Sequence, residues 1–262
     1  MADASIERPD GVAHHSPLVH CIVDGGVATI TLDSPANRNA LSRRLLADMH
    51  DALDIAATAR AIVLTHVGPT FCAGVDLKER SAGPTDAAPM ALAMQRLMEA
   101  PQPTIAALHG AARAGGIGLM AACDLIVAHR SVTFAFTEVR IGVAPAIISV
   151  PILRRAPWGR IAAAFLTGEM FTAQDALRMD LITHVTDDVD AQVQQLTDAV
   201  VAAAPNAVAM TKTLLRGAAS RQLTDDFATM RALSESLFGS AEAAEGMRAF
   251  AERRPPDWTL SG

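Results

Sequence analysis

Residues 109–128, HGAARAGGIGLMAACDLIVA, decide how this chain folds. The stretch begins in an apolar run at 104–110 and ends in a second one at 125–130, and the segment between them has the composition of a short helix. The pair Gly115-Gly116 stands at the expected helix start, where free backbone N–H groups allow another molecule to approach closely. A strand, a glycine turn, a helix and a second strand are typical of a layered α/β fold with crossover connections.

The same alternation of apolar runs and helical segments extends back through the N-terminal third of the chain. Two runs rich in β-branched residues flank the turn at 24–26, which predicts a hairpin. Leucine and methionine at helical spacing predict a helix that Asn39 or a neighbouring residue caps. The expected elements are strands at 18–23, 27–32, 61–67, 104–110, 125–130 and 132–136, and helices at about 41–53, 89–99 and from 116.

The strand pattern fades after about residue 158, and the segments that follow have helical periodicity. The predicted fold class is therefore α/β with a helical C-terminal part. We expect a polar leader at 1–17, the core at 18–200 and a C-terminal helical region at 201–262. Small and turn-forming residues at 81–90 predict a mobile loop there.

The composition fits one domain with a substantial core, because 50% of the 262 residues are hydrophobic and 19% are charged. A net charge of -6 gives no basic surface for nucleic acid. The sequence contains no apolar run of signal-peptide length at its start and none of the ~20 residues that span a membrane, so we expect a cytoplasmic protein without membrane contact. Cys21, Cys72 and Cys123 are far apart and are expected to be free thiols.

Two glycine-rich turns are candidates for binding an oxygen atom. PTFCAGVDLKER at 69–80 follows the 61–67 strand, and HGAARAGG at 109–116 follows the strand at 104–110. Each turn lies between a strand and a helix, so each can present one backbone N–H to the same oxygen as an oxyanion hole. The alternative interpretation is that both are ordinary strand-to-helix turns.

Motifs of other common enzyme classes do not occur in the sequence. The glycines do not form the dinucleotide-binding pattern G-x-G-x-x-G, and there is neither a G-x-x-x-x-G-K-[ST] phosphate loop nor a G-x-S-x-G nucleophile elbow. The histidines near expected strand ends are scattered, so we interpret them as structural rather than as metal ligands; they are His66, His109, His129 and His184.

Glu138 is the candidate acid–base residue. The segment FAFTEVRIGVAPAIISV at 134–150 places this single carboxylate among apolar residues just beyond a strand. Burial disfavours the charged form of a carboxylate and raises its pKa, which suits proton transfer near neutral pH. The alternative is a structural ion pair with Arg140 or another arginine.

Together these segments resemble the enoyl-CoA hydratase/isomerase family, also called the crotonase superfamily. FCAGVDLKE at 71–79 and residues 109–128 resemble its two oxyanion loops, and residues 134–149 resemble its catalytic-glutamate segment. Further matches follow in order along nearly the whole chain: NRNALS, LTGEMFTAQDALRMDLI, AVAMTKTLL and EGMRAFAERRPPDW. The resemblance implies a core of stacked ββα turns and C-terminal helices that build a homotrimer or a hexamer.

The resemblance also implies site residues, position by position. The backbone N–H groups of Val75 and Gly115 would hold the thioester carbonyl as it becomes an enolate, and Glu138 would transfer the proton. A coenzyme A thioester is the implied substrate, and no tightly bound cofactor or metal is expected. The coenzyme A site would include Arg38, Ala73, Asp76 and Leu77, together with Phe250 and Arg253 from a segment that in many members comes from a neighbouring subunit.

The sequence departs from the family pattern at Gly118, where hydratases usually carry a second glutamate. Three activities stay open. The first is hydration of a straight or branched 2-enoyl-CoA, the second is Δ3,Δ2-enoyl-CoA isomerisation by Glu138 alone, and the third is acyl-CoA binding with weak catalysis. Hydration agrees with the subgroup that the motifs resemble, whereas isomerisation agrees with the single acid. Arg113, beside the oxyanion glycine, would contact a substrate carboxylate or form a surface ion pair.

Overall fold

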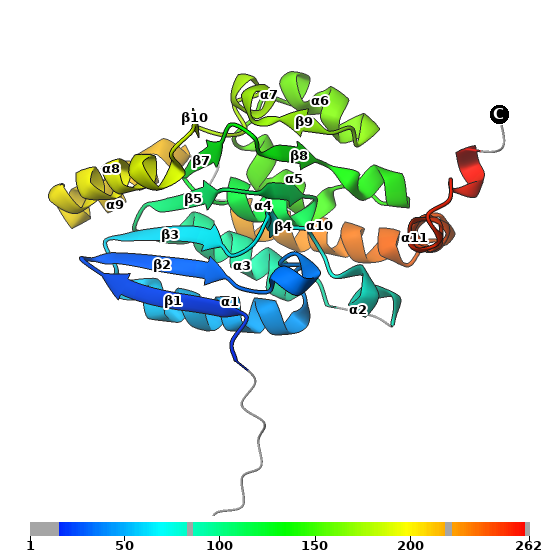
Figure 1. Cartoon of the computed structure of the whole chain (residues 1–262), viewed down its shortest axis with the longest axis horizontal. Coiled ribbons are helices and arrows are strands. Elements are labelled where there is room, and N and C mark those ends of the chain that lie inside the picture. The colour runs from blue at the N-terminus through cyan, green and yellow to red at the C-terminus, as the bar shows by residue number, and fades with distance from the viewer. Residues whose placement is uncertain (1–15, 83–85, 218–221, 260–262) are drawn as a thin grey trace, which may run out of the picture.

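The computed structural model describes residues 16–82, 86–217 and 222–259. Its strands form two sheets (Figure 1). The larger sheet has the order β1-β2-β3-β5-β7-β10 and the smaller one has the order β4-β6-β8-β9. The strands are β1 (Val19–Asp24), β2 (Val27–Leu32), β3 (Ala61–His66), β4 (Thr70–Cys72), β5 (Thr104–Leu108), β6 (Ala111–Arg113), β7 (Leu125–His129), β8 (Thr133–Ala135), β9 (Phe171–Thr172) and β10 (His184–Thr186).

The larger sheet is parallel from its second strand onward. β1 and β2 pair antiparallel, and the positive φ angles of Gly25 and Gly26 close the turn between them, which confirms the predicted hairpin. Each later neighbour pairs in parallel, so the chain must cross over after each strand. Every residue of β5 is buried, because helices cover both faces of the sheet at this strand.

The helices lie around the two sheets, as Figure 1 shows. They are α1 (Arg43–Ile55), α2 (Leu77–Ser81), α3 (Ala88–Glu99), α4 (Gly115–Ala121), α5 (Ala146–Leu153), α6 (Trp158–Thr167), α7 (Ala173–Arg178), α8 (Val189–Ala202), α9 (Pro205–Arg216), α10 (Leu223–Phe238) and α11 (Ala241–Glu252), with a 3-10 helix η3 (Thr137–Ile141) after β8. Helices α8–α11 follow β10 in the described part of the chain, which confirms the predicted C-terminal helical part.

One unit repeats three times along the core. A strand of the larger sheet is followed at once by a strand of the smaller sheet and then by a helix: β3-β4-α2, β5-β6-α4 and β7-β8-η3. The turns of successive units stack closely, because a Cβ on Gly110 would lie 2.3 Å from the carbonyl oxygen of Pro69. The stacked ββα core implied by the resemblance is therefore confirmed.

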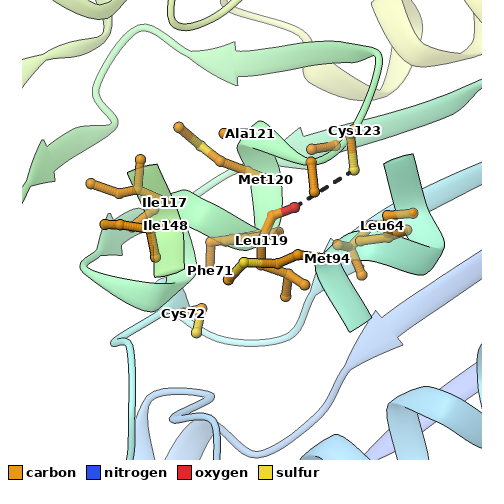
Figure 2. Packing of buried hydrophobic residues seen from close by; sticks show 14 of the residues in the cluster. Leu64, Phe71, Cys72, Met94, Ile117, Leu119, Met120, Ala121, Cys123 and Ile148 are labelled. Carbon is orange, nitrogen blue, oxygen red and sulfur yellow. Dashed lines mark hydrogen bonds between the residues drawn. The ribbon is translucent and has the colours of Figure 1, made fainter. Parts of the chain in front are cut away.

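Helix α4 lies inside the main hydrophobic cluster. All seven of its residues are buried. Small residues suit this position, because other segments of the same chain pack against the helix from every side. Figure 2 shows Leu119 and Met120 of this helix among side chains from several other elements, with Phe71 and Met94 nearby. The N-terminus of α4 is consequently held rigidly.

The structure differs from the sequence-based prediction in several local features. β9 and β10 follow residue 158, where only helices were expected, β4 and β6 lie in segments expected to be turns, and α2 and α5 are additional helices. The prediction that Asn39 or a neighbouring residue caps α1 is confirmed for the neighbour: Ser42 Oγ accepts from Leu45 N and caps the helix. The buried Asn39 side chain instead accepts from Ser34 N and donates to two carbonyl oxygens.

Some predictions lie outside the described residues. Residues 1–15 of the expected leader and 83–85 of the expected loop are among them. Within the loop prediction, Ser81 belongs to α2 and α3 begins at Ala88, so both ends of that segment are helical. The domain boundaries after residues 17 and 200 stay predictions.

Candidate active site

The two predicted oxyanion loops meet at the ends of β4 and β6. Gly74 has φ +90°, and a Cβ there would lie 2.9 Å from Ala114 Cβ and 3.2 Å from the backbone nitrogen of Gly115. At the next residue of the second loop, a Cβ on Gly116 would lie 2.5 Å from the carbonyl oxygen of Cys72. Only glycine permits this approach, so the glycines bring the two loops together as the sequence predicted.

The backbone N–H groups of Val75 and Gly115 are free to bind a ligand. The flanking groups are used, because Leu41 N donates to Gly74 O (2.8 Å) and Asp76 N donates to Leu41 O (3.5 Å). Among the backbone hydrogen bonds of the described residues, neither Val75 N nor Gly115 N has an acceptor, and both residues line one cavity. Two such donors on one cavity are the elements of an oxyanion hole.

Ala114 fixes the second loop through an unusual backbone conformation. It has φ 45° and ψ −120°, a region that alanine rarely adopts. Its N–H donates to Ala135 O (3.1 Å), and its carbonyl oxygen accepts from Ile117 N (2.9 Å) in the first turn of α4. These bonds hold Gly115 as the first residue of α4, where its own N–H has no helical partner.

Glu138 lies in η3 with 9% of its surface exposed and lines the same cavity. Burial raises the pKa of its carboxyl group to about 7, although its own backbone N–H lowers it slightly. Its Oε2 atom has no hydrogen-bond partner among the described residues. The alternative of an ion pair with Arg140 is wrong, because that side chain is exposed and donates to Thr167 O (3.2 Å).

The cavity has a volume of about 70 Å³ and is mostly apolar. Glu138 carries the only carboxylate among the described residues that line it. Its lining combines the two loops and η3 with residues that the sequence analysis did not single out: Met90 of α3, Ile147 and Ile148 of α5, and Ser234 and Phe238 of α10. These residues are distant in the sequence, so only the fold brings them to the site.

The structure separates the residues implied at the coenzyme A site into two groups. Ala73 and Leu77 line the cavity. Asp76 accepts from Lys78 N and Glu79 N and so caps α2. Arg38 is exposed, and its carbonyl oxygen accepts from Ala73 N (3.0 Å).

Phe250 and Arg253, like Arg38 and Asp76, are absent from the lining of the cavity within one chain. Phe250, on the last turn of α11, is 61% exposed, and Arg253 is an exposed residue just after the helix. Their role at the coenzyme A site therefore stays a prediction.

Neither interpretation of Arg113 fits its surroundings. The guanidinium donates to the hydroxyl oxygen of Thr133 on β8 (2.9 Å) and to the carbonyl oxygen of the same residue. It also donates to Ala112 O (2.9 Å). Arg113 is absent from the cavity lining, and within the described part of the chain it forms no ion pair. Its half-buried side chain instead links β6 to β8.

Other features of the described residues concern metals, thiols and membranes. No group of three or more histidine, cysteine, aspartate or glutamate side chains there is placed to hold a metal ion. Cys72 and Cys123 are buried free thiols, whose pKa burial raises to about 12, and Cys21 is a half-buried free thiol. None of the helices in this part of the chain is long and apolar enough to cross a membrane.

Comparisons with known proteins agree with this geometry. A family model for enoyl-CoA hydratase/isomerase matches residues 23–261. Enoyl-CoA hydratase EchA19 of Mycobacterium tuberculosis is 32% identical over 248 residues, which cover 89% of this chain and 93% of that protein. The crystal structure of an enoyl-CoA hydratase from Mycobacterium avium matches with a TM-score of 0.86 and 41% identity, over 93% of this chain and 100% of that one.

A more distant structure has the same fold with an acyl-CoA analogue. Methylmalonyl-CoA decarboxylase in complex with 2-nitronate-propionyl-CoA matches with a TM-score of 0.81 and 26% identity, over 92% of this chain and 97% of that one. The stacked ββα fold and its cavity thus define a crotonase-type acyl-CoA protein. The chain belongs to the enoyl-CoA hydratase/isomerase family, whose enzymes act on coenzyme A thioesters.

Proposed function

We propose that this enzyme adds water across the double bond of a 2-enoyl-CoA and uses Glu138 as its only acid–base residue. The observation that carries the proposal is the unpaired, buried Glu138 carboxyl group on the cavity that Val75 and Gly115 also line. The names of the relatives at 32% and 41% identity support hydration as the reaction.

The chemistry begins with the thioester carbonyl oxygen accepting hydrogen bonds from Val75 N and Gly115 N. This polarises the conjugated double bond and makes C3 electrophilic. Glu138, as a carboxylate, takes a proton from water while the water oxygen forms its bond to C3. The π electrons of the C2–C3 bond then become the C1–C2 bond of an enolate, whose negative charge rests on the thioester oxygen.

The second step returns the proton. The enolate collapses, and its C2 takes the proton now carried by Glu138, which restores the carboxylate and leaves a 3-hydroxyacyl-CoA. One carboxyl group therefore serves as base and then as acid, and the atoms of one water are all used. A pKa of about 7 suits this double role, because neither the charged nor the neutral form is strongly favoured at neutral pH.

Isomerisation is the second candidate, and the lining of the cavity favours it. With no second carboxylate there, a water molecule has only Glu138 as an acidic or basic anchor. The same residue would then take a proton from C2 of a 3-enoyl-CoA and return it to C4, through a dienolate whose oxygen is held in the same oxyanion hole. No water is consumed in that reaction.

Product analysis separates the two reactions. The purified enzyme is incubated with crotonyl-CoA and, separately, with a 3-enoyl-CoA in oxygen-labelled water, and the products are examined by mass spectrometry. Hydration adds one labelled oxygen at C3 of crotonyl-CoA. A shifted double bond in the 3-enoyl-CoA, with crotonyl-CoA unchanged, would contradict hydration and establish isomerisation.

We also propose that the protein works as a homo-oligomer. Large apolar side chains of α9 and α11 are exposed in the single chain: Leu214 is 77% exposed, Leu215 is 84% exposed and Phe250 is 61% exposed. A neighbouring subunit would cover such residues and, for Phe250 and Arg253, supply them to the coenzyme A site. Sedimentation analysis tests this, and a monomer at micromolar concentration would contradict it.

A further inference from the structure

A side chain at position 118 has no room in this fold. Gly118 is buried on α4, one turn after Gly115, so both residues lie on the same side of the helix. A Cβ added to Gly118 would lie 2.4 Å from Ile148 Cγ2 and 2.8 Å from Ile148 Cβ, and 2.8 Å from Met94 Cε. Real Cβ atoms essentially never approach that closely, so at least one neighbour would have to move.

The two neighbours differ in how easily they can move. Met94 contributes only the far end of a flexible side chain. Ile148 is 2% exposed on α5 and contributes Cβ itself, and a β-branched residue in a helix has essentially one rotamer. Figure 2 shows the Ile148 side chain directly beside Ile117 of α4. Ile148 is therefore the fixed obstacle.

Ile148 also belongs to the active site, because it lines the cavity together with Glu138 and Gly115. We propose that Ile148 is a specificity-determining residue, which fills the space beside Gly118 with a hydrocarbon wall and so confines acid–base chemistry to Glu138. In this arrangement Gly118 and Ile148 are a matched pair. The inference rests on the proposed enoyl-CoA chemistry. It identifies Ile148 as the residue that prevents a second carboxyl group from entering the site.

The matched pair predicts that a side chain can be added at position 118 if the side chain at position 148 is removed. A carboxylate enters at position 118 only when the Ile148 side chain is removed. Ile148→Ala is not enough, since alanine retains the Cβ at 2.8 Å, whereas Ile148→Gly removes both close contacts. The informative set is thus Gly118→Glu, Ile148→Gly and the double variant, each compared with the unchanged enzyme.

The test measures the rate of crotonyl-CoA hydration by the four proteins. We expect Gly118→Glu alone to lose about 10²-fold or more, because it strains the cavity wall. The double variant is expected to exceed Ile148→Gly by about tenfold or more, since a second positioned acid–base group typically contributes 10²–10⁴-fold. A double variant no faster than Ile148→Gly, or a Gly118→Glu variant with unchanged activity, would overturn the proposal.

A stability measurement keeps the proposal testable if the glutamate variants do not fold. Gly118→Ala adds only the Cβ, and overpacking of this kind should lower the melting temperature by about 3–8 °C. Adding Gly118→Ala to Ile148→Gly should lower it by no more than about 1 °C. Equal losses in both backgrounds would show that the two positions are not coupled.

Failure of the proposed function gives a different result. If the unchanged enzyme shifts a double bond and adds no water, hydration is refuted by its products alone. The melting temperatures and the loss in Gly118→Glu still report on the pair, because they do not depend on which reaction is measured. In that case the hydration rate of the double variant no longer applies, and missing couplings in these two measurements would refute the role of Ile148.

Discussion

Glu138 and Glu245 are the same side chain in opposite environments. Glu138 is enclosed by apolar residues of the cavity, and no side-chain cation lines that cavity among the described residues, so burial raises its pKa to about 7. Glu245, on α11, accepts from Arg254 Nη1 (2.7 Å) and from Asp257 N (3.0 Å) and is paired with Arg248, and these contacts lower its pKa to about 2. The first arrangement serves proton transfer, and the second stabilises a helix end.

The comparison shows how this chain distinguishes a functional carboxylate from a structural one. An acid that only supports the fold gains stability from partners that favour its charged form. The charged form of Glu138 is disfavoured instead. The rise of its pKa from 4.5 to about 7 corresponds to a free-energy cost of about 3 kcal/mol for the charged form. A fold keeps such an unfavourable group where chemistry requires it.

The largest expected effect is the loss of activity in Glu138→Gln. Glutamine keeps the shape but cannot take or give the proton, so kcat should fall by about 10²–10⁴-fold. Glu245→Gln is the matched control, because the same substitution on α11 leaves the cavity intact, and its kcat should stay within about threefold. Steady-state assays with crotonyl-CoA and with a 3-enoyl-CoA measure both. Unchanged turnover in Glu138→Gln would end the assignment of Glu138 as acid–base residue.

The pH dependence of the rate sharpens the same contrast. The reaction begins with the charged form of Glu138, so kcat should rise with pH below about 7 and level off above it. Glu245→Gln should leave this profile in place, since Glu245 stays charged throughout that range. Initial rates from about pH 5 to about pH 9 test this. A plateau that continues down to pH 5 would show that Glu138 is not the titrating base.

The stability of Glu138→Gln should depend on pH in the direction that the raised pKa dictates. A carboxyl group whose pKa is higher in the folded state favours folding below the unfolded pKa, and that contribution is lost as the pH rises through the folded pKa. Relative to the unchanged protein, the glutamine variant should therefore gain stability between pH 4.5 and about 7. The gain at higher pH should be at most about 3 kcal/mol.

Urea unfolding at about pH 4 and about pH 8 measures this change. The change in the stability difference between the two pH values is the informative quantity. If that difference does not move in favour of the glutamine variant as the pH rises, the environment described for Glu138 is wrong.

Much of the fold follows from sequence patterns that are local. The hairpin at Gly25 and Gly26 and the buried strand β5 have clear signatures in turn residues and in continuous apolar runs. β4, β6, β9 and β10 were missed because strands of two or three residues are too short to show a period. Helix predictions after residue 158 held for α6–α11, where the apolar spacing extends over whole turns.

The site likewise contains residues that the sequence reveals and residues that only the fold reveals. Gly74, Gly115 and Glu138 stand out in the sequence, since a glycine in the turn after an expected strand, a glycine pair and a carboxylate in an apolar run are recognisable there. Ile148 does not, because an isoleucine in an apolar helix is ordinary until the fold sets it against Gly118. Arg113 shows the reverse error: its position suggested a substrate contact or a surface ion pair, but the pleat of β6 turns its side chain to Thr133.

The smallest expected effect concerns Arg254→Met, which leaves Glu138 untouched and changes only the structural side of the comparison. Arg254 is the main cause of the lowered pKa of Glu245, so the pKa of Glu245 should rise in the variant. A lowered pKa contributes stability above the unfolded value, and this contribution is lost as the pH falls toward about 2. The variant should thus be slightly less stable than the unchanged protein above about pH 4.5, and the difference should vanish toward pH 2. Thermal unfolding across that range measures it; a difference that grows on acidification would mean that Arg254 acts through packing rather than through the charge of Glu245.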